Sequence, residues 1–350
     1  MKKIVFGLML VVLLLGACAS PVEAPIVEKE ALVVELAPPV EKEPEVSVFQ
    51  EAQDGKPFRF PNGQYGGTWM SLLLAGWLQA CDDYGLLCEH TYISDNDEAG
   101  VLSYVDTITT ENTSGVMIGM WVESRFITGK KLVEDGISFV APHVGIDASI
   151  VPGMVAWAGP DPDEYSLAAG KAMAEKVDCE GPVGFSQSQS SPMENVVTAG
   201  LQQGFRELCP DTEFLETVLT GNLDMAKAIA VSSAVIQANP DLRAAMTSTA
   251  PGGEAWARAA QENGKEAGEI VIQGMDYMEV NLDLVSSGDI WMLIGQPVYE
   301  EAYYSVVLLV NNLMGLPVPY ANILPAPQIT LENVDGFYDI IEKAEEAMTK

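Results

Sequence analysis

The stretch IVIQGMDYMEVNLDLVSSGDIWMLIGQP, from Ile270 to Pro297, decides the fold class of this chain. It predicts a buried strand, an amphipathic helix and a second buried strand. A polar side chain follows each strand, Asp276 after the first and Gln296 after the second. Because ligands of parallel sheets bind beyond the carboxyl ends of the strands, we expect Asp276 and Gln296 to contact a ligand. The alternative for Asp276 is an N-cap of the following helix, and both roles can coexist.

The same alternation of strands and helices extends along most of the chain. Apolar runs predict nine strands, at residues 86–93, 115–120, 137–141, 154–159, 182–186, 213–219, 243–248, 269–274 and 290–295. Amphipathic segments such as 225–238 and 299–314 predict helices between them. Strands that are buried on both faces form parallel sheets with helices on each side. Because nine strands exceed one such sheet, we expect two similar α/β lobes.

The first strand of the first lobe has a weak sequence pattern. A doubly wound lobe opens with an apolar strand, which here has to precede the helix that begins near Trp69. The candidates are PFRF at 57–60 and the more distant VSVF at 46–49. We therefore expect a short first strand or one from an unexpected part of the chain.

Composition limits the partners of the chain. The 350 residues include 18 Lys and Arg and 50 Asp and Glu, for a formal charge of -32. Beyond residue 50 there are 14 basic and 43 acidic residues, so the charge of -29 belongs to the folded part. A surface this negative repels phosphate backbones, and we expect no nucleic-acid partner.

The N-terminus predicts export. Lys2 and Lys3 precede an apolar run from Ile4 to Leu15, which is too short to span a membrane comfortably and is typical of a secretory signal. The following LLGAC ends at Cys18 and resembles the bacterial lipobox, in which the cysteine is lipidated. We expect a lipoprotein signal peptide at residues 1–18; an ordinary cleaved signal with an incidental cysteine is the alternative.

A segment rich in Pro, Glu and Val follows the signal. Residues 19–56 combine frequent prolines with charge, which disfavours a packed core and predicts a semi-extended tether. An ordered N-terminal extension is the alternative. Within this segment, only Val46 to Phe49 has strand character.

The four cysteines beyond Cys18 permit disulfides in an exported protein. Cys81 lies near a helix end and Cys88 just after the next turn, while Cys179 and Cys209 end the two helices that flank residues 182–186. We favour the pairs Cys81–Cys88 and Cys179–Cys209, with four buried thiols as the alternative. No His or second Cys stands at metal spacing, so we expect no metal.

Three segments resemble the type I periplasmic substrate-binding proteins, in particular the ribose/galactose-type proteins of ABC importers. They are GPVGFSQSQSSPMENVVTAGLQQGFREL, NPDLRAAMTSTAPGGEAWARAAQENGK, and the GMD…DLVSSGDIWMLIGQP segment with the following EEAYYSVVLLVNNLMGLPV. The resemblance covers about Tyr65 to Thr330. It implies two doubly wound lobes with a ligand cleft between them, joined by a hinge of three strands near 157–161, 274–277 and 322–325. The expected N-terminal lobe is 57–157 plus 277–322, and the C-terminal lobe is 158–276 plus 323–350.

The resemblance also implies binding residues. Asp276 and Gln296 match family residues that bind ligand hydroxyls, and Trp69 stands where the family uses aromatic rings against a sugar. Elsewhere the chain departs from the family. His143-Val144 replaces an Asp-Arg pair, Leu201 stands near the position of an arginine, and Thr249-Ala250 replaces Asn-Asp. These departures put ribose or galactose as the ligand in doubt.

Position at strand ends supplies the remaining candidates. His143 and Trp121 follow predicted strands, and a neutral imidazole can donate and accept one hydrogen bond each. Trp69 and Trp121 are either core residues or stacking platforms for a sugar or a nucleobase. Weaker candidates are Asn195, which could substitute for the family's arginine, Asn222 and Thr249.

We predict a monomeric, lipid-anchored solute-binding protein that delivers a sugar-like ligand to an ABC permease and its ATPase. No P-loop, dinucleotide fingerprint or GxSxG motif is present, so we expect no cofactor and no catalysis. A sensory receptor for a chemoreceptor or kinase, and a nucleoside-type ligand, are the alternatives. An exported enzyme would need a nucleophile beside His90 or His143, and none is evident.

Overall fold

The computed structural model of the chain describes residues 47–62, 68–93, 97–143, 145–188, 192–221 and 224–349. The expected signal peptide, lipidation at Cys18, the tether up to residue 46 and Asn222 lie outside the described residues. Within the described ranges, no helix combines the length and the apolar character needed to cross a membrane.

The first lobe is built on a parallel sheet of six strands. They are β1 (Phe58–Asn62), β2 (Cys88–Tyr92), β3 (Gly115–Met117), β4 (Phe139–Pro142), β5 (Ala156–Gly159) and β11 (Ala321–Ile323). Their order in the sheet is β11-β5-β4-β3-β1-β2, and every neighbouring pair is parallel. In this doubly wound order, the topological switch point lies between β1 and β3.

The second lobe repeats the arrangement. Its strands are β6 (Val183–Gln187), β7 (Val218–Leu219), β8 (Ala244–Thr247), β9 (Val271–Met275), β10 (Met292–Ile294) and β12 (Gln328–Ile329). The order is β12-β10-β9-β8-β6-β7, in which only the β10–β12 pair is antiparallel. Two similar doubly wound lobes are confirmed.

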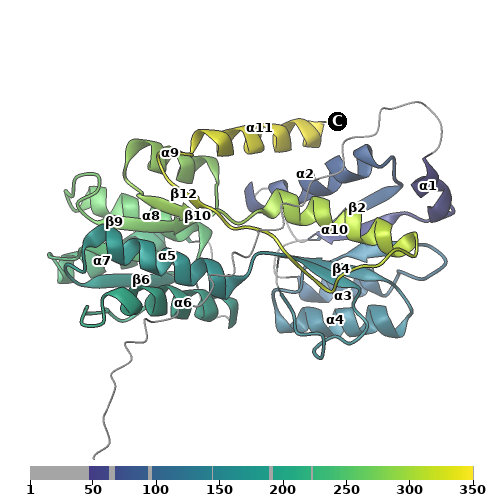
Figure 1. Cartoon of the computed structure of the whole chain (residues 1–350), viewed down its shortest axis with the longest axis horizontal. Helices are drawn as coiled ribbons and strands as arrows, with labels where there is room; N and C mark the ends of the chain where they lie inside the picture. The colour runs from purple at the N-terminus through teal and green to yellow at the C-terminus, as the bar shows by residue number, and fades with distance from the viewer. Residues whose placement is uncertain are drawn as a thin grey trace, which may run out of the picture. The chain divides into compact units, whose positions relative to one another are not determined.

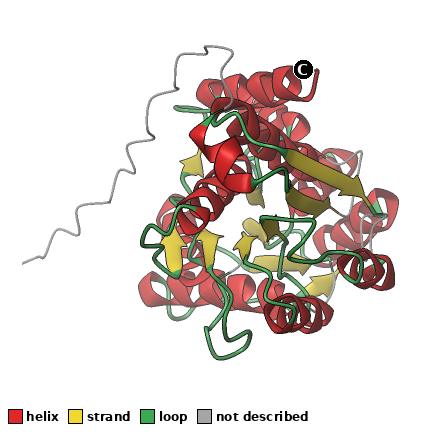
Figure 2. Ribbon diagram, turned by 90° about the vertical axis from the view of Figure 1, so that its right-hand side faces the viewer, coloured by secondary structure: helices red, strands yellow, loops and turns green. Residues whose placement is uncertain are grey.

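Helices cover both faces of each sheet (Figures 1 and 2). In the first lobe, α2 (Thr68–Asp83) and α10 (Val298–Leu313) pack together, as do α3 (Glu98–Val105) and α4 (Glu123–Glu134). In the second lobe the pairs are α5 (Pro162–Val177) with α6 (Pro192–Leu208), and α7 (Met225–Ala238) with α8 (Ala250–Glu262). The helix α9 (Glu279–Ser287) packs on α8. The buried strands are therefore shielded from water on each side, as their apolar sequences require.

The chain passes between the lobes three times, and one of these crossings was predicted wrongly. The first crossing lies between β5 and α5 and the third between β11 and β12, close to the expected places. The second lies between β10 and α10, at Gln296–Pro297, instead of 274–277. The reason is that β10 pairs with β9, so residues 277–296 belong to the second lobe and not to the first.

The C-terminal helix α11 (Asp335–Thr349) contacts both lobes, so its assignment to the second lobe alone was incomplete. It packs against α2 of the first lobe and α9 of the second. The Tyr338 hydroxyl donates to Asp283 of α9 at 2.8 Å, and the Phe337 ring lies 5.3 Å from the Tyr277 ring. Figure 1 shows α11 extending over α9 and α2.

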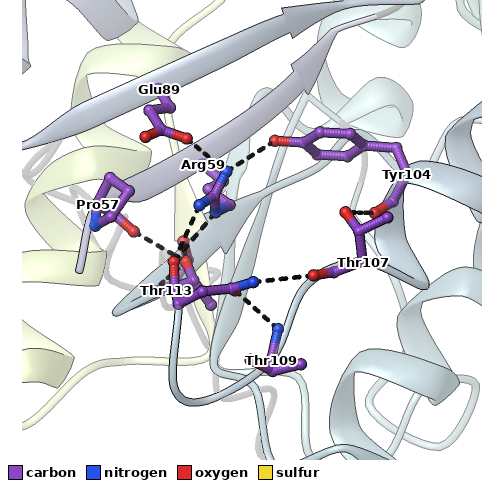
Figure 3. Close-up of polar contacts among 9 residues, drawn as sticks. Pro57, Arg59, Glu89, Tyr104, Thr107, Thr109 and Thr113 are labelled. Atoms are coloured by element: carbon purple, nitrogen blue, oxygen red, sulfur yellow. Dashed lines mark hydrogen bonds and ion pairs between the residues drawn. The ribbon is translucent and has the colours of Figure 1, made fainter.

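The weak first strand is β1, which matches the candidate PFRF. Its Arg59 side chain is mostly buried and donates to the Asn112 carbonyl at 3.0 Å, to Glu89 at 2.5 Å and to the Tyr104 hydroxyl at 3.3 Å. The Thr113 hydroxyl donates to the Pro57 carbonyl at 2.9 Å (Figure 3). Polar contacts thus fix a strand that interrupts its apolar pattern with an arginine.

The folded part begins earlier than expected. Val48 and Phe49, expected to have strand character, belong to the helix α1 (Val48–Gln53), which Ser47 caps. The Gln53 amide exchanges two hydrogen bonds with the Leu87 backbone, at 2.8 and 2.7 Å. Residues 47–56 are therefore part of the first lobe and not of a tether that extends to residue 56.

The structure contains the two disulfides that the sequence favoured, Cys81–Cys88 and Cys179–Cys209. The first joins the end of α2 to the start of β2. The second joins the ends of α5 and α6. Each links neighbouring elements of one lobe, so neither restrains one lobe against the other.

Glycines allow α5 and α6 to approach closely, which fixes the position of α5. A Cβ atom at Gly204 would lie 2.1 Å from the Leu167 carbonyl oxygen, and one at Gly170 would lie 2.2 Å from that of Leu201. Backbone atoms cannot move aside as the end of a flexible side chain can. The small residues therefore set the interhelical distance.

We predict that Gly204→Ala destabilises the protein by about 1–3 kcal/mol, because the added methyl group forces α5 and α6 apart. The matched control is Gly336→Ala in α11, where nothing lies within 4 Å of the added Cβ. That change should be neutral or stabilising by up to about 1 kcal/mol. Urea unfolding of both variants measures the difference; equal effects would show that the helices do not pack this closely.

Candidate functional site

Side chains from both lobes meet at the carboxyl ends of the strands. We call this set the strand-end cluster; its members are Trp69, Trp121, His143, Glu301, Asp276, Tyr165 and Gln296. The first four come from the first lobe and the last three from the second. Trp69 and Trp121 follow β1 and β3, on the two sides of the switch point. That is where a doubly wound sheet presents its ligand site.

Three aromatic rings line the first-lobe side of the cluster. The Trp69 centroid lies 5.7 Å from that of Trp121 and 5.0 Å from that of His143, both nearly perpendicular. The Trp121 ring packs over Gly119, where a Cβ atom would lie 1.6 Å from the indole. The position of Trp121 thus requires glycine two residues before it. Both indoles are half-buried and suited to an apolar ring face.

His143 is held by a buried carboxylate. Its Nδ1 lies 3.2 Å from Oε2 and 3.3 Å from Oε1 of Glu301, whose side chain is fully buried in α10. Because an ionised carboxylate only accepts, Nδ1 carries the proton of this bond and Nε2 is left for another partner. Burial lowers the pKa of His143, but the charge and hydrogen bond of Glu301 and the charge of Asp276 raise it more, to above its ordinary value.

Asp276 occupies a constrained turn at the end of β9. Its φ of 64° is in the left-handed region, which is uncommon for a residue with a side chain. The Asn281 amide holds the turn by donating to the carbonyls of Met275 at 2.9 Å and Asp276 at 3.1 Å. The N-cap of α9 is Met278, so Asp276 is not the helix cap considered from the sequence.

The Asp276 carboxyl group is buried without full compensation. The residue is 7% exposed, and its Oδ1 atom has no hydrogen-bond partner. Burial raises the pKa of Asp276 from 3.8 to about 7, with His143 opposing the shift and Glu301 adding to it. A buried acceptor without a donor is costly, so this atom is suited to receive a donor from a ligand.

Gln296 completes the second-lobe side. It follows β10, is 6% exposed, and its Nε2 donates to the Tyr165 hydroxyl at 3.3 Å. The Tyr165 side chain comes from the first turns of α5 and is also buried. Asp276 and Gln296 end adjacent strands, since the Asp276 amide donates to the Ile294 carbonyl at 2.9 Å. The expected lobe boundaries placed Asp276 in the C-terminal lobe and Gln296 in the N-terminal lobe. This was wrong, because β9 and β10 share one sheet.

The weaker candidates lie apart from the cluster contacts. Asn195 is exposed in α6 and accepts a hydrogen bond from Gln187 Nε2 at 3.2 Å. Thr249 is buried before α8, and its hydroxyl bonds that of Thr247 at 3.3 Å. The hydrogen-bond partners of these two side chains, Gln187 and Thr247, are not members of the strand-end cluster. Ligand contact by either one stays a prediction.

Sequence reasoning missed Glu301, Tyr165 and Asn281. Glu301 lies in the buried stripe of α10, with Val298, Ala302 and Ser305 on the same helix face. A carboxylate within an apolar helical stripe is a detectable pattern, since helix neighbours recur at three and four residues. Asn281 repeats this pattern in α9, between Met278 and Leu282, and it is fully buried.

A surface hollow elsewhere has a different character. Its volume is about 290 Å³, and it lies between α5 and α6, lined by Asp163, Leu167, Val196, Ala199, Gly200 and Gln203. None of these residues belongs to the strand-end cluster. We take the cluster as the candidate site because its buried polar atoms converge. In the described part of the chain, no three His, Cys, Asp or Glu side chains are grouped to hold a metal ion.

Comparison with known families agrees with this geometry. Residues 58–317 match the model of the periplasmic binding protein domain. The chain belongs to the periplasmic binding protein family. Its members bind solutes rather than transform them, and they work outside the cytoplasm. Curated protein sequences yield no significant match.

Solved structures share the fold of this periplasmic binding protein. The sugar-binding protein of a sugar ABC transporter from Bacillus halodurans is 22% identical, with a TM-score of 0.73 over 81% of this chain and 100% of that one. A periplasmic ribose ABC transporter protein from Conexibacter woesei is 17% identical, with a TM-score of 0.74 over 83% and 98%. A solute-binding protein from Actinobacillus succinogenes with bound D-allose is 13% identical, with a TM-score of 0.72 over 80% and 99%.

We predict that Asp276→Asn makes stability less dependent on pH. The raised pKa of Asp276 favours folding fully below its ordinary value of 3.8, and this contribution is lost as the pH rises through about 7. The asparagine variant therefore gains stability relative to the parent as the pH rises, on the order of 4 kcal/mol in total. Urea unfolding at several pH values between about 4 and 8 measures the difference.

The control is Asp339→Asn, which removes an exposed carboxylate from α11. It reports the general effect of one less negative charge. The pKa of His143 is also raised, and its contribution cancels between the parent and Asp339→Asn. In Asp276→Asn the charge of Asp276 no longer raises the pKa of His143, so this contribution shrinks and the pH dependence weakens in the same direction. Parallel curves for the parent and both variants would contradict the burial of an ionisable Asp276.

Proposed function

We propose that the protein binds a sugar-like polar ligand at the strand-end cluster and delivers it to an ABC permease with its ATPase. The two lobes close on the ligand about the three crossings, and the protein acts as a monomer. The observation that carries this proposal is the buried, unpartnered Oδ1 atom of Asp276, which lies in a cluster of residues from both lobes. Family membership supports the role in solute binding.

The chemistry of the cluster suits a ring that carries hydroxyl groups. Asp276 accepts hydrogen bonds, and Gln296 and His143 supply donors and acceptors. Trp69 and Trp121 offer aromatic faces for the apolar side of a sugar. Solute-binding proteins with a similar fold have been solved with bound D-allose and with bound myo-inositol. A nucleoside would use the same aromatic faces and remains the second ligand class.

We propose binding without catalysis. A general base needs a nucleophile or substrate proton within hydrogen-bond reach. In the cluster, the Nδ1 of His143 is occupied by Glu301. All cysteines among the described residues form disulfides, so none of them offers a thiolate. The polar groups of the cluster are arranged to hold a ligand.

We propose a lipid anchor at Cys18, on the outer side of the membrane. The lipobox-like LLGAC and the tether beyond it support this assignment. The tether would let the folded part reach a permease while it stays at the membrane surface. A lipid anchor also keeps the binding protein close to its transporter, which raises its local concentration.

We predict that at least one pentose, hexose, polyol or nucleoside raises the melting temperature of the full-length protein. A ligand that binds only the folded state at about 100 times its dissociation constant stabilises by about 2.7 kcal/mol. Gln296→Ala should weaken that ligand by about tenfold or more, because it removes a buried donor and acceptor. Thermal-shift screening and titration calorimetry measure both effects.

The control is Gln261→Ala, which removes an exposed amide at the end of α8. It should leave affinity unchanged. The proposed function fails if no compound of the four classes binds. The assigned site fails if Gln296→Ala binds as the parent does.

We predict that Cys18→Ser moves the protein from the membrane fraction to the soluble one, because a serine cannot form the thioether of a lipid anchor. Detergent phase partitioning of cells that express either form measures this. The folded part should retain its ligand affinity. Equal partitioning of the two forms would show that Cys18 does not carry the anchor.

A further inference from the structure

The strand-end cluster holds more negative than positive charge. Burial, and then the charges of Asp276, Glu301 and Asp161, raise the pKa of the Tyr165 hydroxyl, although the hydrogen bond from Gln296 opposes this. Three carboxylates therefore act on one buried phenol. The cationic counterpart in the cluster is the His143 imidazolium, which already pairs with Glu301.

Among the described residues, no lysine or arginine balances this charge. The groups that shift the pKa values of Asp276, His143 and Tyr165 include only acidic residues, His143 and Gln296. Arg125 is the basic residue that reaches the edge of the cluster, 5.5 Å from the Trp121 ring. It is 4% exposed and pairs with Glu98 at 2.5 Å, so its charge is already compensated.

The unpartnered Oδ1 atom of Asp276 is where a positively charged ligand group would bind. Glu301 is occupied by His143, and the Asp161 carboxylate accepts from the amides of Asp163 and Glu164 at 3.0 and 3.3 Å. Asp276 Oδ1 lacks any such donor, although it is buried. Among the described residues, the buried acceptor of the cluster that lacks a hydrogen-bond donor is therefore Asp276 Oδ1. Glu301 and Asp161 already accept hydrogen bonds from the protein.

We infer that the ligand is an amine-bearing sugar or polyol whose ammonium group binds Asp276 Oδ1. The inference rests on the proposed function and specifies its ligand. An ammonium group supplies both a hydrogen bond and a positive charge, and bonds between two ionised groups are stronger than neutral ones. The half-buried indoles of Trp69 and Trp121 also attract cations through their ring faces.

A neutral ligand would leave the cluster poorly compensated. A hydroxyl group can donate one hydrogen bond to Oδ1, but it brings no charge. Closing the site around a neutral sugar would bury the excess negative charge further, and burial of unpaired charge is unfavourable. The cationic ligand removes this penalty, and that difference creates the specificity.

The test compares matched ligands on the full-length protein by titration calorimetry near neutral pH. The probes are the 2-amino-2-deoxy, N-acetyl and parent forms of glucose, galactose and mannose. In at least one series, the amine should bind at least about tenfold tighter than the parent sugar, because the ammonium group adds a positive charge to the hydrogen bond with the carboxylate. The N-acetyl form keeps the nitrogen without its charge and should show no such advantage.

Asp276→Asn separates charge from shape. The variant keeps the size and one acceptor of the side chain, so its advantage for the amine should fall to within about twofold. Asp339→Asn, which removes an exposed carboxylate, should keep the full advantage. Putrescine, an aliphatic diamine, should bind at least about tenfold more weakly than the amino sugar, since it has no ring to stack on the indoles and no hydroxyl groups to bond Gln296.

The outcomes distinguish this inference from the proposed function. If the parent sugars bind as tightly as the amino sugars or more tightly, the inference that the ligand carries an amine is wrong, while the solute-binding role stands. An amine preference that persists in Asp276→Asn would overturn the role of Oδ1. Binding of putrescine without any amino sugar would overturn the sugar-like ligand. Binding by none of the probes would overturn the inference, and failure of the wider ligand screen as well would overturn the proposed function.

Discussion

The whole arrangement depends on one requirement, that each parallel sheet be covered by helices on both faces. The first sheet obtains part of its cover from α10, although α10 follows β10 of the second sheet in the chain. The chain therefore has to leave the second lobe immediately after Gln296. This return brings the buried Glu301 beside His143. Packing of apolar surface thus decides which polar groups meet at the strand ends.

The meeting of the lobes sets the electrostatics of the site. The family resemblance implies that arginines accompany acids at such sites, whereas here Leu201 is fully buried in the core of the second lobe and His143 takes a strand-end position. An imidazole held by a carboxylate provides less positive charge than a guanidinium, because it can lose its proton. The carboxyl group of Asp276 is left under-compensated. The departures from the family pattern at Leu201 and His143 therefore both reduce the positive charge near the Asp276 carboxyl group.

Much of the fold follows from local patterns, but long-range pairings do not. The apolar runs predicted β2 to β10, and position after these runs predicted Asp276, Gln296, His143 and Trp121 as strand-end groups. Trp69 was predicted from the family resemblance. The second crossing was placed wrongly because a strand-ending Asp looks the same whether the next helix stays in its lobe or leaves it. Glu301 was missed because its role depends on a partner 158 positions away. The weak strand β1 depends in the same way on Arg59 contacts with distant residues.

The C-terminal helix has a mechanical consequence. α11, with its 15 residues, rests on α2 of one lobe and bonds Asp283 of the other through Tyr338. The three covalent crossings permit rotation by changes in a few backbone dihedrals. α11 follows β12 of the second lobe in the chain and reaches the first lobe through its packing against α2. Rotation of one lobe relative to the other therefore has to displace α11 from its contacts with α2 or with α9. The stiffness of the molecule is therefore set partly by a segment that lies outside both sheets.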